Sequence, residues 1–272
     1  MMLANQANWD QRTPIHLVSS FYGVNGSRKP ESWFARYEWG DLGDLQDVDL
    51  LHLQCHLGVE TVALALRGAR AVGVDISGES VVHARAIAAR HGVGVEYVQA
   101  NVYDAVAALR GRQFDLIYTG KGALCYLPDL GAWADVVRRL LRVGGFLYLV
   151  EFHPLLYSLG VVPPAGAGSE LLLRNDYLAG RGVERRDATY TYTDGSALAD
   201  ARVAYEWRHS LGDVVSALAS AGLTIEVLRE DDALPWPRFK EMARGDDGWF
   251  RLPADRPRVP LFYALRARRV LT

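Results

Sequence analysis

Short apolar runs alternate with amphipathic stretches from residue 48 onward. The apolar runs are four to six residues long and lack strict alternation, at 49–53, 71–74, 95–99, 114–118 and 146–150. Runs of this kind are typical of strands that are buried on both faces of a parallel sheet. The stretches between them predict helices at 59–66, 80–91, 104–109 and 130–141. Strand–helix alternation implies right-handed crossovers and therefore predicts an α/β fold with a doubly wound sheet.

The regular pattern stops after residue 150. Residues 154–206 contain Pro154, Pro163, Pro164, a glycine-rich patch at 166–168 and an alternating run at 189–193. A helix at 213–221 and strands at 224–228 and 261–267 follow, with a proline-rich excursion at 231–258. We expect 154–206 and 231–258 to be insertions beyond strand ends, where substrate sites are usually built. The pair Arg185–Arg186 is interpreted as solvated.

Residues 1–45 differ from the rest of the chain because they are irregular and rich in aromatic residues. We therefore divide the chain into an N-terminal segment at 1–45 and one domain at 46–272. The length of 272 residues suits a single elaborated domain, and 50% apolar with 23% charged residues is ordinary for a soluble globule.

Charge and cysteine content narrow the function classes. Thirty basic and 32 acidic residues give a net charge of −2, so the sequence predicts no nucleic-acid partner. Cys55 and Cys125 are too few for a disulfide framework, which indicates a reducing compartment. No run approaches 18 apolar residues, and residues 1–10 lack a basic start followed by an apolar run. We expect a cytoplasmic protein that does not bind membranes.

The most informative segment is the turn after the first strand. The sequence Leu-His-Leu-Gln-Cys-His-Leu-Gly begins at Leu51, and Asp75 ends the next strand 21 positions after Gln54. This spacing is typical of nucleoside sites in doubly wound folds, where the carboxylate binds two ribose hydroxyls. A dinucleotide fingerprint would need glycine at Gln54, His56 and Val59, so the side chains there disfavour a pyrophosphate. Asp75 could alternatively cap the turn into the following helix.

At these residues the sequence resembles the class I S-adenosylmethionine-dependent methyltransferases. Their first motif usually contains three alternating glycines, of which only Gly58 remains here, and the Leu-His-Leu-Gln-Cys-His start resembles a variant bacterial small-molecule branch. Residues 73–77, 99–103, 114–118 and 140–145 resemble the later motifs in order and spacing. The resemblance implies a Rossmann-like seven-stranded sheet with an antiparallel last strand. It also implies an N-terminal lid at 1–45.

The resemblance further implies that S-adenosylmethionine is the cofactor. Asp75 would bind the ribose with Ile76 beside it, and Asn101 with Val102 would meet the adenine. The other implied contacts are the first-motif residues and the end of the fourth strand: His52, Gln54, Cys55, His56, Gly58, Thr119 and Gly120.

The turn also admits two other interpretations. His52, Cys55 and His56 could suggest a metal, but zinc needs three or four convergent ligands and no further pair with suitable spacing follows, so we predict no metal. Cys55 and Cys125 could each be a nucleophile, but a small buried cysteine is the more common case.

Candidate catalytic residues come from the strand ends and the lid. His153 follows the fifth strand and could accept a substrate proton, or it could simply bond a backbone carbonyl in its proline-terminated turn. His16 is a second candidate base. Trp9, Tyr22 and Tyr126 are candidate substrate-lining residues, and the aromatic lid either excludes water near the sulfonium or only packs.

The sequence thus predicts methyl transfer to an oxygen or nitrogen atom of a small molecule. The alternatives are a non-catalytic protein that binds an adenosyl ligand and a nicotinamide-dependent oxidoreductase. The acceptor and the oligomeric state, including a homodimer, stay open at this point.

Overall fold

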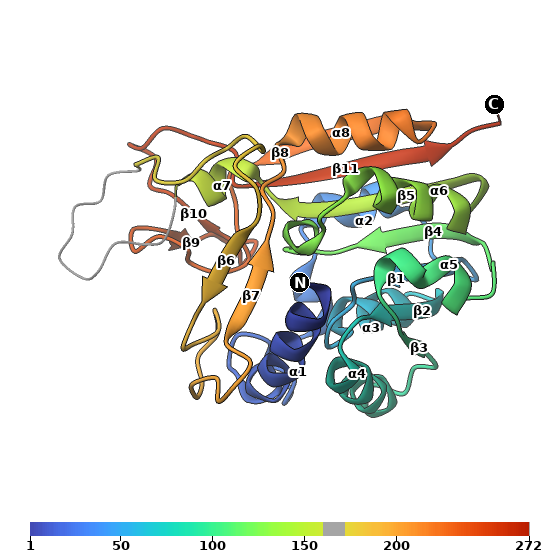
Figure 1. Ribbon diagram of the computed structural model, residues 1–272, viewed down its shortest axis with the longest axis horizontal. Coiled ribbons are helices and arrows are strands. Elements are labelled where there is room, and N and C mark those ends of the chain that lie inside the picture. Colours follow the sequence, from blue (N-terminus) through green and yellow to red (C-terminus); the bar gives the residue numbers. More distant parts are fainter. Residues whose placement is uncertain (160–171, 272) are drawn as a thin grey trace.

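A seven-stranded sheet runs through the molecule in the order β3-β2-β1-β4-β5-β11-β8 (Figure 1). In this computed structural model, which describes residues 1–159 and 172–271, β1 to β5 pair in parallel in this sheet, and β11 runs antiparallel to both of its neighbours, β5 and β8. The predicted doubly wound sheet with an antiparallel last strand is therefore confirmed. The strands are β1 Asp49–Leu53, β2 Arg70–Asp75, β3 Glu96–Gln99, β4 Phe114–Thr119, β5 Leu141–Phe152, β8 Leu223–Asp231 and β11 Phe262–Arg269.

Helices cover both faces of this sheet and enclose two apolar core layers. One layer packs the sheet against α2, α3 and α4, and the other packs it against α5, α6 and α8. The bounds are α2 Arg36–Leu42, α3 Val59–Leu66, α4 Gly78–Arg90, α5 Ala105–Ala108, α6 Leu130–Leu140 and α8 Leu211–Ser220, with short 3-10 turns at Pro30–Trp33, Val102–Asp104 and Leu124–Tyr126. The predicted helices from 59 to 141 and at 213–221 lie within three residues of these bounds.

The fifth strand is longer than its apolar run predicted. β5 begins at Leu141, so residues 143–145, which precede the predicted strand at 146–150, lie inside the observed strand, with an irregularity opposite Phe114 and Leu116. A Cβ at Gly145 would lie 2.8 Å from the Asp115 carbonyl oxygen, so the neighbouring backbone requires glycine there.

Residues 1–45 are not irregular, which corrects the sequence-based prediction. The helix α1 spans Met2–Val18 and contains Pro14. Its buried side chains are mostly polar, and they are Asn5, Asn8, Arg12, Thr13, Ile15 and His16. Because the buried face is polar, the apolar periodicity that normally reveals a helix is missing.

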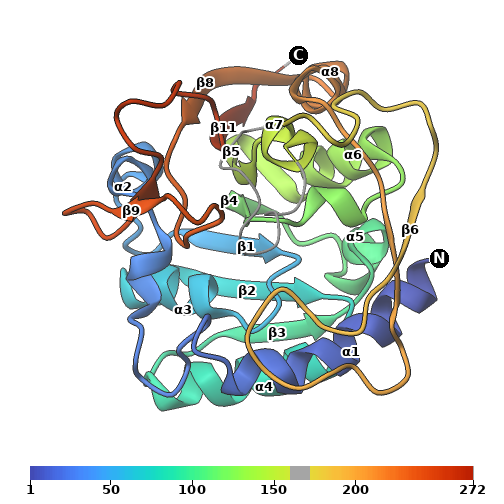
Figure 2. The same cartoon turned by 90° about the vertical axis from the view of Figure 1, so that its left-hand side faces the viewer.

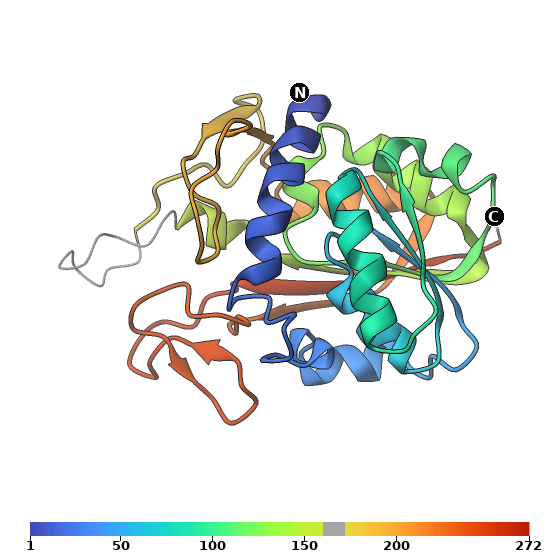
Figure 3. The ribbon, with the colours of Figure 1, turned by 90° about the horizontal axis from the view of Figure 1, so that it is seen from below.

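Amide side chains attach α1 to the free edge of a hairpin. Asn5 donates to the Tyr205 carbonyl oxygen at 2.9 Å and accepts from the Tyr205 N–H at 2.7 Å. The Gln11 side-chain oxygen accepts from the N–H of Asp200 at 3.1 Å and of Ala201 at 3.0 Å. Figure 3 shows α1 running between α4 and this hairpin, and α1 contacts both.

In their described residues, the two predicted insertions consist mainly of loops and small sheets. The first contains α7 Pro154–Ser158 and the hairpin of β6 Glu184–Asp187 and β7 Val203–Glu206, with the run 189–193 in its connecting loop. The second contains β9 Ala243–Arg244 and β10 Phe250–Arg251. Pro163, Pro164 and the patch 166–168 lie outside the described residues. Over 1–159 and 172–271, no helix is long and apolar enough to cross a membrane.

Candidate functional site

A large cavity lies at the carboxyl ends of the parallel strands. In Figure 2 these ends point toward the side where α1 and the β6–β7 hairpin cross the sheet. Its volume is about 630 Å³, which is in the range of small-molecule sites. Its floor comes from the segments after β1, β2, β3 and β4, and its walls come from α1, α7 and both insertions.

The turn after β1 has three residues with left-handed backbone, and two of these three are not glycine. The φ angles are 58° at Gln54, 47° at His56 and 66° at Gly58. Left-handed backbone costs a non-glycine residue about 1–2 kcal/mol, so the surrounding structure must hold this turn in place. One such contact is the Gln54 side-chain amide, which donates to the Ala123 carbonyl oxygen at 2.9 Å.

Gly58 is required by packing as well as by its φ angle. A Cβ at this position would lie 2.3 Å from the Tyr97 hydroxyl, and a Cβ at Gly73 would lie 2.6 Å from the same ring. Tyr97 therefore fills the space under the turn that larger residues at 58 and 73 would occupy. Gly58 and Cys55 both line the cavity, so the structure brings them to the predicted site.

Asp75 ends β2 and faces the same cavity. Its carboxylate accepts from the N–H of His56 at 2.7 Å and of Ser77 at 2.9 Å, which leaves acceptor capacity on both oxygens. Burial raises the pKa of Asp75 to about 6. Ile76, Asn101 and Val102 also line the cavity, and the Asn101 oxygen accepts from the Tyr103 N–H at 3.2 Å.

Two predicted cofactor residues lie behind the cavity wall. His52 is 1% exposed, and its Nδ1 lies 2.7 Å from the Thr61 hydroxyl. Burial lowers the pKa of His52 to about 4, so the ring is neutral near pH 7. Thr119 is also fully buried, whereas the adjacent Gly120 lines the cavity.

A buried charge cluster beside His52 was missed in the sequence. Glu60, in the first turn of α3, lines the cavity and lies 2.8 Å from the Lys121 ammonium, which is also 3.9 Å from Glu38. Burial alone would raise the pKa of Glu60, but Lys121 and His52 lower it overall, whereas burial raises the pKa of Glu38 to about 7. An acidic residue in the first helical turn was the available signal, but it also has an ordinary helix-start interpretation.

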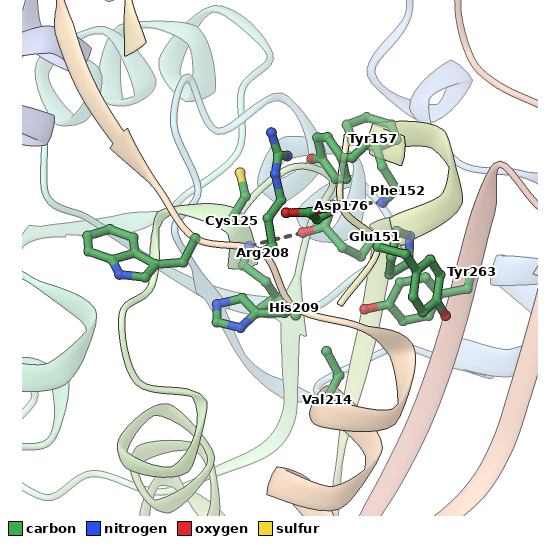
Figure 4. Close-up of a pocket in the computed structure, with 13 residues that line it drawn as sticks. Cys125, Glu151, Phe152, Tyr157, Asp176, Arg208, His209, Val214 and Tyr263 are labelled. Atoms are coloured by element: carbon green, nitrogen blue, oxygen red, sulfur yellow. Dashed lines mark hydrogen bonds between the residues drawn. The ribbon is translucent and has the colours of Figure 1, made fainter. Parts of the chain in front are cut away.

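The loop after β4 is fixed by one carboxylate. Glu151, near the end of β5, accepts from the N–H groups of Gly122, Ala123 and Leu124 and from that of Phe152. Figure 4 shows Glu151 in the smaller pocket behind this loop, together with Cys125 and Tyr157. The loop thereby presents Cys125 and Tyr126 to the main cavity.

A chain of hydrogen bonds joins α1 to the first turn. Thr13 donates to the Trp9 carbonyl oxygen at 2.8 Å, so the Ser80 hydroxyl must donate to Thr13 at 2.7 Å. Ser80 then accepts from His56 Nδ1 at 3.0 Å, and His56 Nε2 accepts from His16 Nδ1 at 2.9 Å. Each ring is thus assigned one proton by its neighbours.

The two histidines of this chain are held neutral. His16 Nε2 accepts from the Thr191 hydroxyl at 2.6 Å, so both ring nitrogens of His16 are already in use. Burial lowers the pKa of His16 strongly and lowers the pKa of His56 to about 3. His56 lines the cavity, but His16 does not.

His153 is also absent from the main cavity lining. Its Nδ1 accepts from the Leu155 N–H at 3.1 Å at the start of α7, and its Nε2 lies 2.9 Å from the Glu230 carboxylate. The bond is local to the Pro154 turn, but the partner is a backbone N–H and not the backbone carbonyl that the sequence-based interpretation named.

The predicted aromatic residues do meet in the cavity. Trp9, Tyr22 and Tyr126 all line it, and the Trp9 ring makes edge contacts with the Tyr126 ring at 5.3 Å and the His56 ring at 5.0 Å. Cys55 and Cys125 are free thiols whose pKa values are raised by burial. Over the described part of the chain, no group of three or more His, Cys, Asp and Glu residues could hold a metal ion.

Arg186 departs from its predicted solvated role. Its Nε lies 2.9 Å from the Glu206 carboxylate, and both side chains line the cavity. Arg185 on the same strand is 55% exposed, as expected for a solvated residue.

Comparison with known proteins gives a family match for the strand–helix core. Residues 51–147 match the model of a methyltransferase domain. The chain is 30% identical over 142 residues to the ubiquinone biosynthesis O-methyltransferase of Pseudomonas putida (strain GB-1), covering 51% of this chain and 58% of that protein. The protein of the same name from Nitrosomonas europaea is 26% identical over 135 residues, covering 49% and 54%. The chain thus spans a little over half the length of these curated relatives.

Solved structures share the architecture over most of the chain. A putative S-adenosylmethionine-dependent methyltransferase from Listeria monocytogenes superposes with a TM-score of 0.60 at 18% identity, covering 86% of this chain and 98% of that one. An S-adenosylmethionine-dependent methyltransferase from Mesorhizobium loti superposes with a TM-score of 0.57 at 21% identity, covering 86% and 99%. At these identities the likeness concerns the fold.

Proposed function

We propose that this chain, which has the class I methyltransferase fold, transfers a methyl group from S-adenosylmethionine to an oxygen or nitrogen atom of a small molecule. The observation that carries this proposal is Asp75 in a cavity of about 630 Å³, beside a turn with left-handed backbone at 54, 56 and 58. When bound, S-adenosylmethionine would supply an electrophilic methyl group on a positively charged sulfur.

The residues present fit the adenosyl part of this cofactor. Asp75 has free acceptor positions for two ribose hydroxyls, since its two backbone hydrogen bonds use only part of its capacity. Ile76 and Val102 offer apolar contact to a planar base, and Asn101 offers an amide at its edge. The side chains of Gln54 and His56 occupy the space that a pyrophosphate would need, which disfavours the oxidoreductase alternative.

Glu60 and Lys121 fit the amino-acid part. His52 belongs to the first motif and was predicted to contact the cofactor, but its side chain is buried behind the cavity wall. Glu60 places a carboxylate in the cavity instead, with Lys121 next to it. We infer that this pair receives the ammonium and carboxylate groups of the methionine moiety.

The N-terminal segment 1–45 would act as a lid over the reaction site. α1 places Trp9 and Arg12 in the cavity, and the following loop adds Phe21 and Tyr22. Since both ring nitrogens of His16 are hydrogen-bonded and His153 faces Glu230, we favour catalysis by positioning and water exclusion over base catalysis by either residue.

Calorimetric titration tests this function. Wild type is titrated with S-adenosylmethionine, S-adenosylhomocysteine and NAD, and Asp75→Ala is compared with Asp104→Ala, which removes an exposed carboxylate. We expect micromolar affinity for both adenosyl ligands, about 100-fold weaker in Asp75→Ala because two charge-assisted hydrogen bonds are lost, and unchanged in Asp104→Ala.

No adenosyl binding by wild type would contradict the proposal, and tight binding of NAD would favour the oxidoreductase. Binding followed by no methyl transfer to a panel of phenols, carboxylic acids and amines would favour the non-catalytic alternative.

A further inference from the structure

The part of the cavity that is lined by α1 and the two insertions is rich in arginine. Arg12 of α1, Arg186 of β6 and Arg238 of the second insertion all line it. Arg208 lines the adjoining smaller pocket, where Figure 4 shows it extending toward Cys125 and Tyr157. These four side chains come from three segments that are far apart in the sequence.

The carboxylates near this cluster are already engaged. Glu206 and Glu184 both pair with Arg186, at 2.9 Å and 3.1 Å, and Glu184 also contacts Arg208. Glu151 is used by four backbone N–H groups, and Asp176 pairs with Arg181 at 3.1 Å. Arg186 and Arg208 thus share Glu184 and Glu206, and within the described residues Arg12 adds a positive charge that no carboxylate at ion-pair distance offsets.

Arg12 is the member of the cluster whose surroundings indicate a bound anion. It is 6% exposed, its Nε has no hydrogen-bond partner, and no carboxylate within the described ranges lies at ion-pair distance. Its contacts are the Tyr126 hydroxyl at 3.4 Å and the Trp9 ring at 5.2 Å. A buried cation with an unused donor is costly unless an anion completes it.

The walls around the cluster suit a flat ring. Trp9 and Tyr126 meet edge to face beside Arg12, and Phe152 meets Trp236 edge to face at 4.8 Å on the other wall. Edge-to-face walls of this kind pack well against planar molecules. The cavity therefore combines aromatic surface with a localised positive charge.

We propose that the methyl acceptor is a planar molecule with an anionic group, a carboxylate or a phosphate, which Arg12 binds together with Arg186 and Arg238. The arginine side chains recognise the acceptor by its anionic group, and a separate oxygen or nitrogen atom of the acceptor receives the methyl group. This inference rests on the proposed methyl-transfer function, because it assigns the second half of the same cavity.

Small probes test the site without knowledge of the true acceptor. Benzoate, phenyl phosphate and the neutral isostere benzamide are titrated into the protein saturated with S-adenosylhomocysteine. We expect at least one of the two anions to bind at least tenfold more tightly than benzamide, since hydrogen bonds to a charged group are stronger than those to a neutral one. The order of benzoate and phenyl phosphate then identifies which anion the site prefers.

Variants separate a ligand site from a structural cluster. Arg12→Gln and Arg238→Gln should each weaken anion binding about tenfold or more and leave S-adenosylhomocysteine affinity unchanged. Arg12→Lys keeps the charge and should retain part of the affinity. Arg185→Gln, on the same strand as Arg186 but exposed, is the matched control and should change neither affinity.

The outcomes distinguish the two proposals. Loss of the preference for anions over benzamide, no anion binding at millimolar concentration, or unchanged binding in both Gln variants would overturn the acceptor inference while S-adenosylhomocysteine still binds. If S-adenosylhomocysteine itself fails to bind wild type, the methyl-transfer function fails first.

Discussion

The two halves of the cavity are built in different ways. The half around Asp75 uses residues at the ends of consecutive strands, and its contacts join the Asp75 carboxylate to backbone N–H groups two residues away and on the turn after the adjacent strand. The half around Arg12 and Glu206 uses side chains from α1 and both insertions, which meet across about 200 residues of sequence, as Asn5 and Tyr205 do.

This difference shows that the fold itself provides the cofactor half of the cavity, whereas the side chains of this particular sequence form the other half. Strand ends of a doubly wound sheet converge whatever the side chains are, so a nucleoside site there needs few specific residues. The other half has no such framework, and its chemistry depends on which side chains the lid and the insertions happen to carry. We expect the first half to respond to backbone changes and the second to changes at long-range side-chain contacts.

The largest expected effect comes from adding a single methyl group to the turn. Gly58→Ala forces alanine into a φ of +66° and brings its Cβ to 2.3 Å from the Tyr97 hydroxyl. We expect a loss of about 3 kcal/mol in the free energy of unfolding, measured by chemical denaturation. Gly92→Ala has a φ of +69° with nothing within 4 Å and should lose only about 1 kcal/mol. Equal losses would mean that Tyr97 does not constrain the turn.

A smaller effect is expected at the junction of the lid and the hairpin. Asn5→Ala removes both hydrogen bonds to the Tyr205 backbone and should lower the free energy of unfolding by about 2 kcal/mol. Hydrogen exchange at the Tyr205 amide should accelerate, while S-adenosylhomocysteine affinity stays within twofold. Leu3→Ala, on the same helix at 81% exposure, is the control. A large drop in cofactor affinity in Asn5→Ala would show that the two halves are not separable.

The smallest effect is a pH dependence confined to the cofactor half. Burial raises the pKa of Asp75 to about 6, so its carboxylate is ionised above that pH and protonated below it. A protonated carboxyl accepts fewer hydrogen bonds from a ribose, so S-adenosylhomocysteine affinity should be constant from pH 7 to 8 and fall about tenfold by pH 5. Calorimetry across this range measures it, and Asp75→Asn should flatten the curve. A flat curve in wild type would place the pKa of Asp75 well below 5.

The sequence predicted the doubly wound sheet with its antiparallel last strand, and it predicted that Asp75 ends a strand, because both follow from local patterns. Buried parallel strands are continuous apolar runs, and a carboxylate at the end of β2 has one characteristic position. It did not predict α1, because the buried face with Asn5, Asn8 and Thr13 lacks apolar periodicity. It did not predict the Arg186–Glu206 pair either, since ion pairs between strands of an inserted hairpin leave no spacing signal.

The placement of His52 and Glu60 marks the limit of motif-based reasoning. Alignment with the first motif predicted a cofactor contact at His52. In the structure the His52 side chain is buried behind the cavity wall, and Glu60 lines the cavity. Which of two nearby polar residues reaches a cavity depends on side-chain direction and packing, which spacing alone does not encode.

The polar face of α1 also has a consequence for how the protein is made. Residues 2–18 leave the ribosome long before Asp200, Ala201 and Tyr205, the backbone partners of Gln11, Asn8 and Asn5. If the face of this helix were apolar, it would stay exposed to solvent until the hairpin had been synthesised, and exposed apolar surface promotes misassembly and aggregation. Amide side chains are instead well solvated by water. The nascent segment 2–18 can therefore stay solvated and pack against the hairpin after the hairpin has been synthesised.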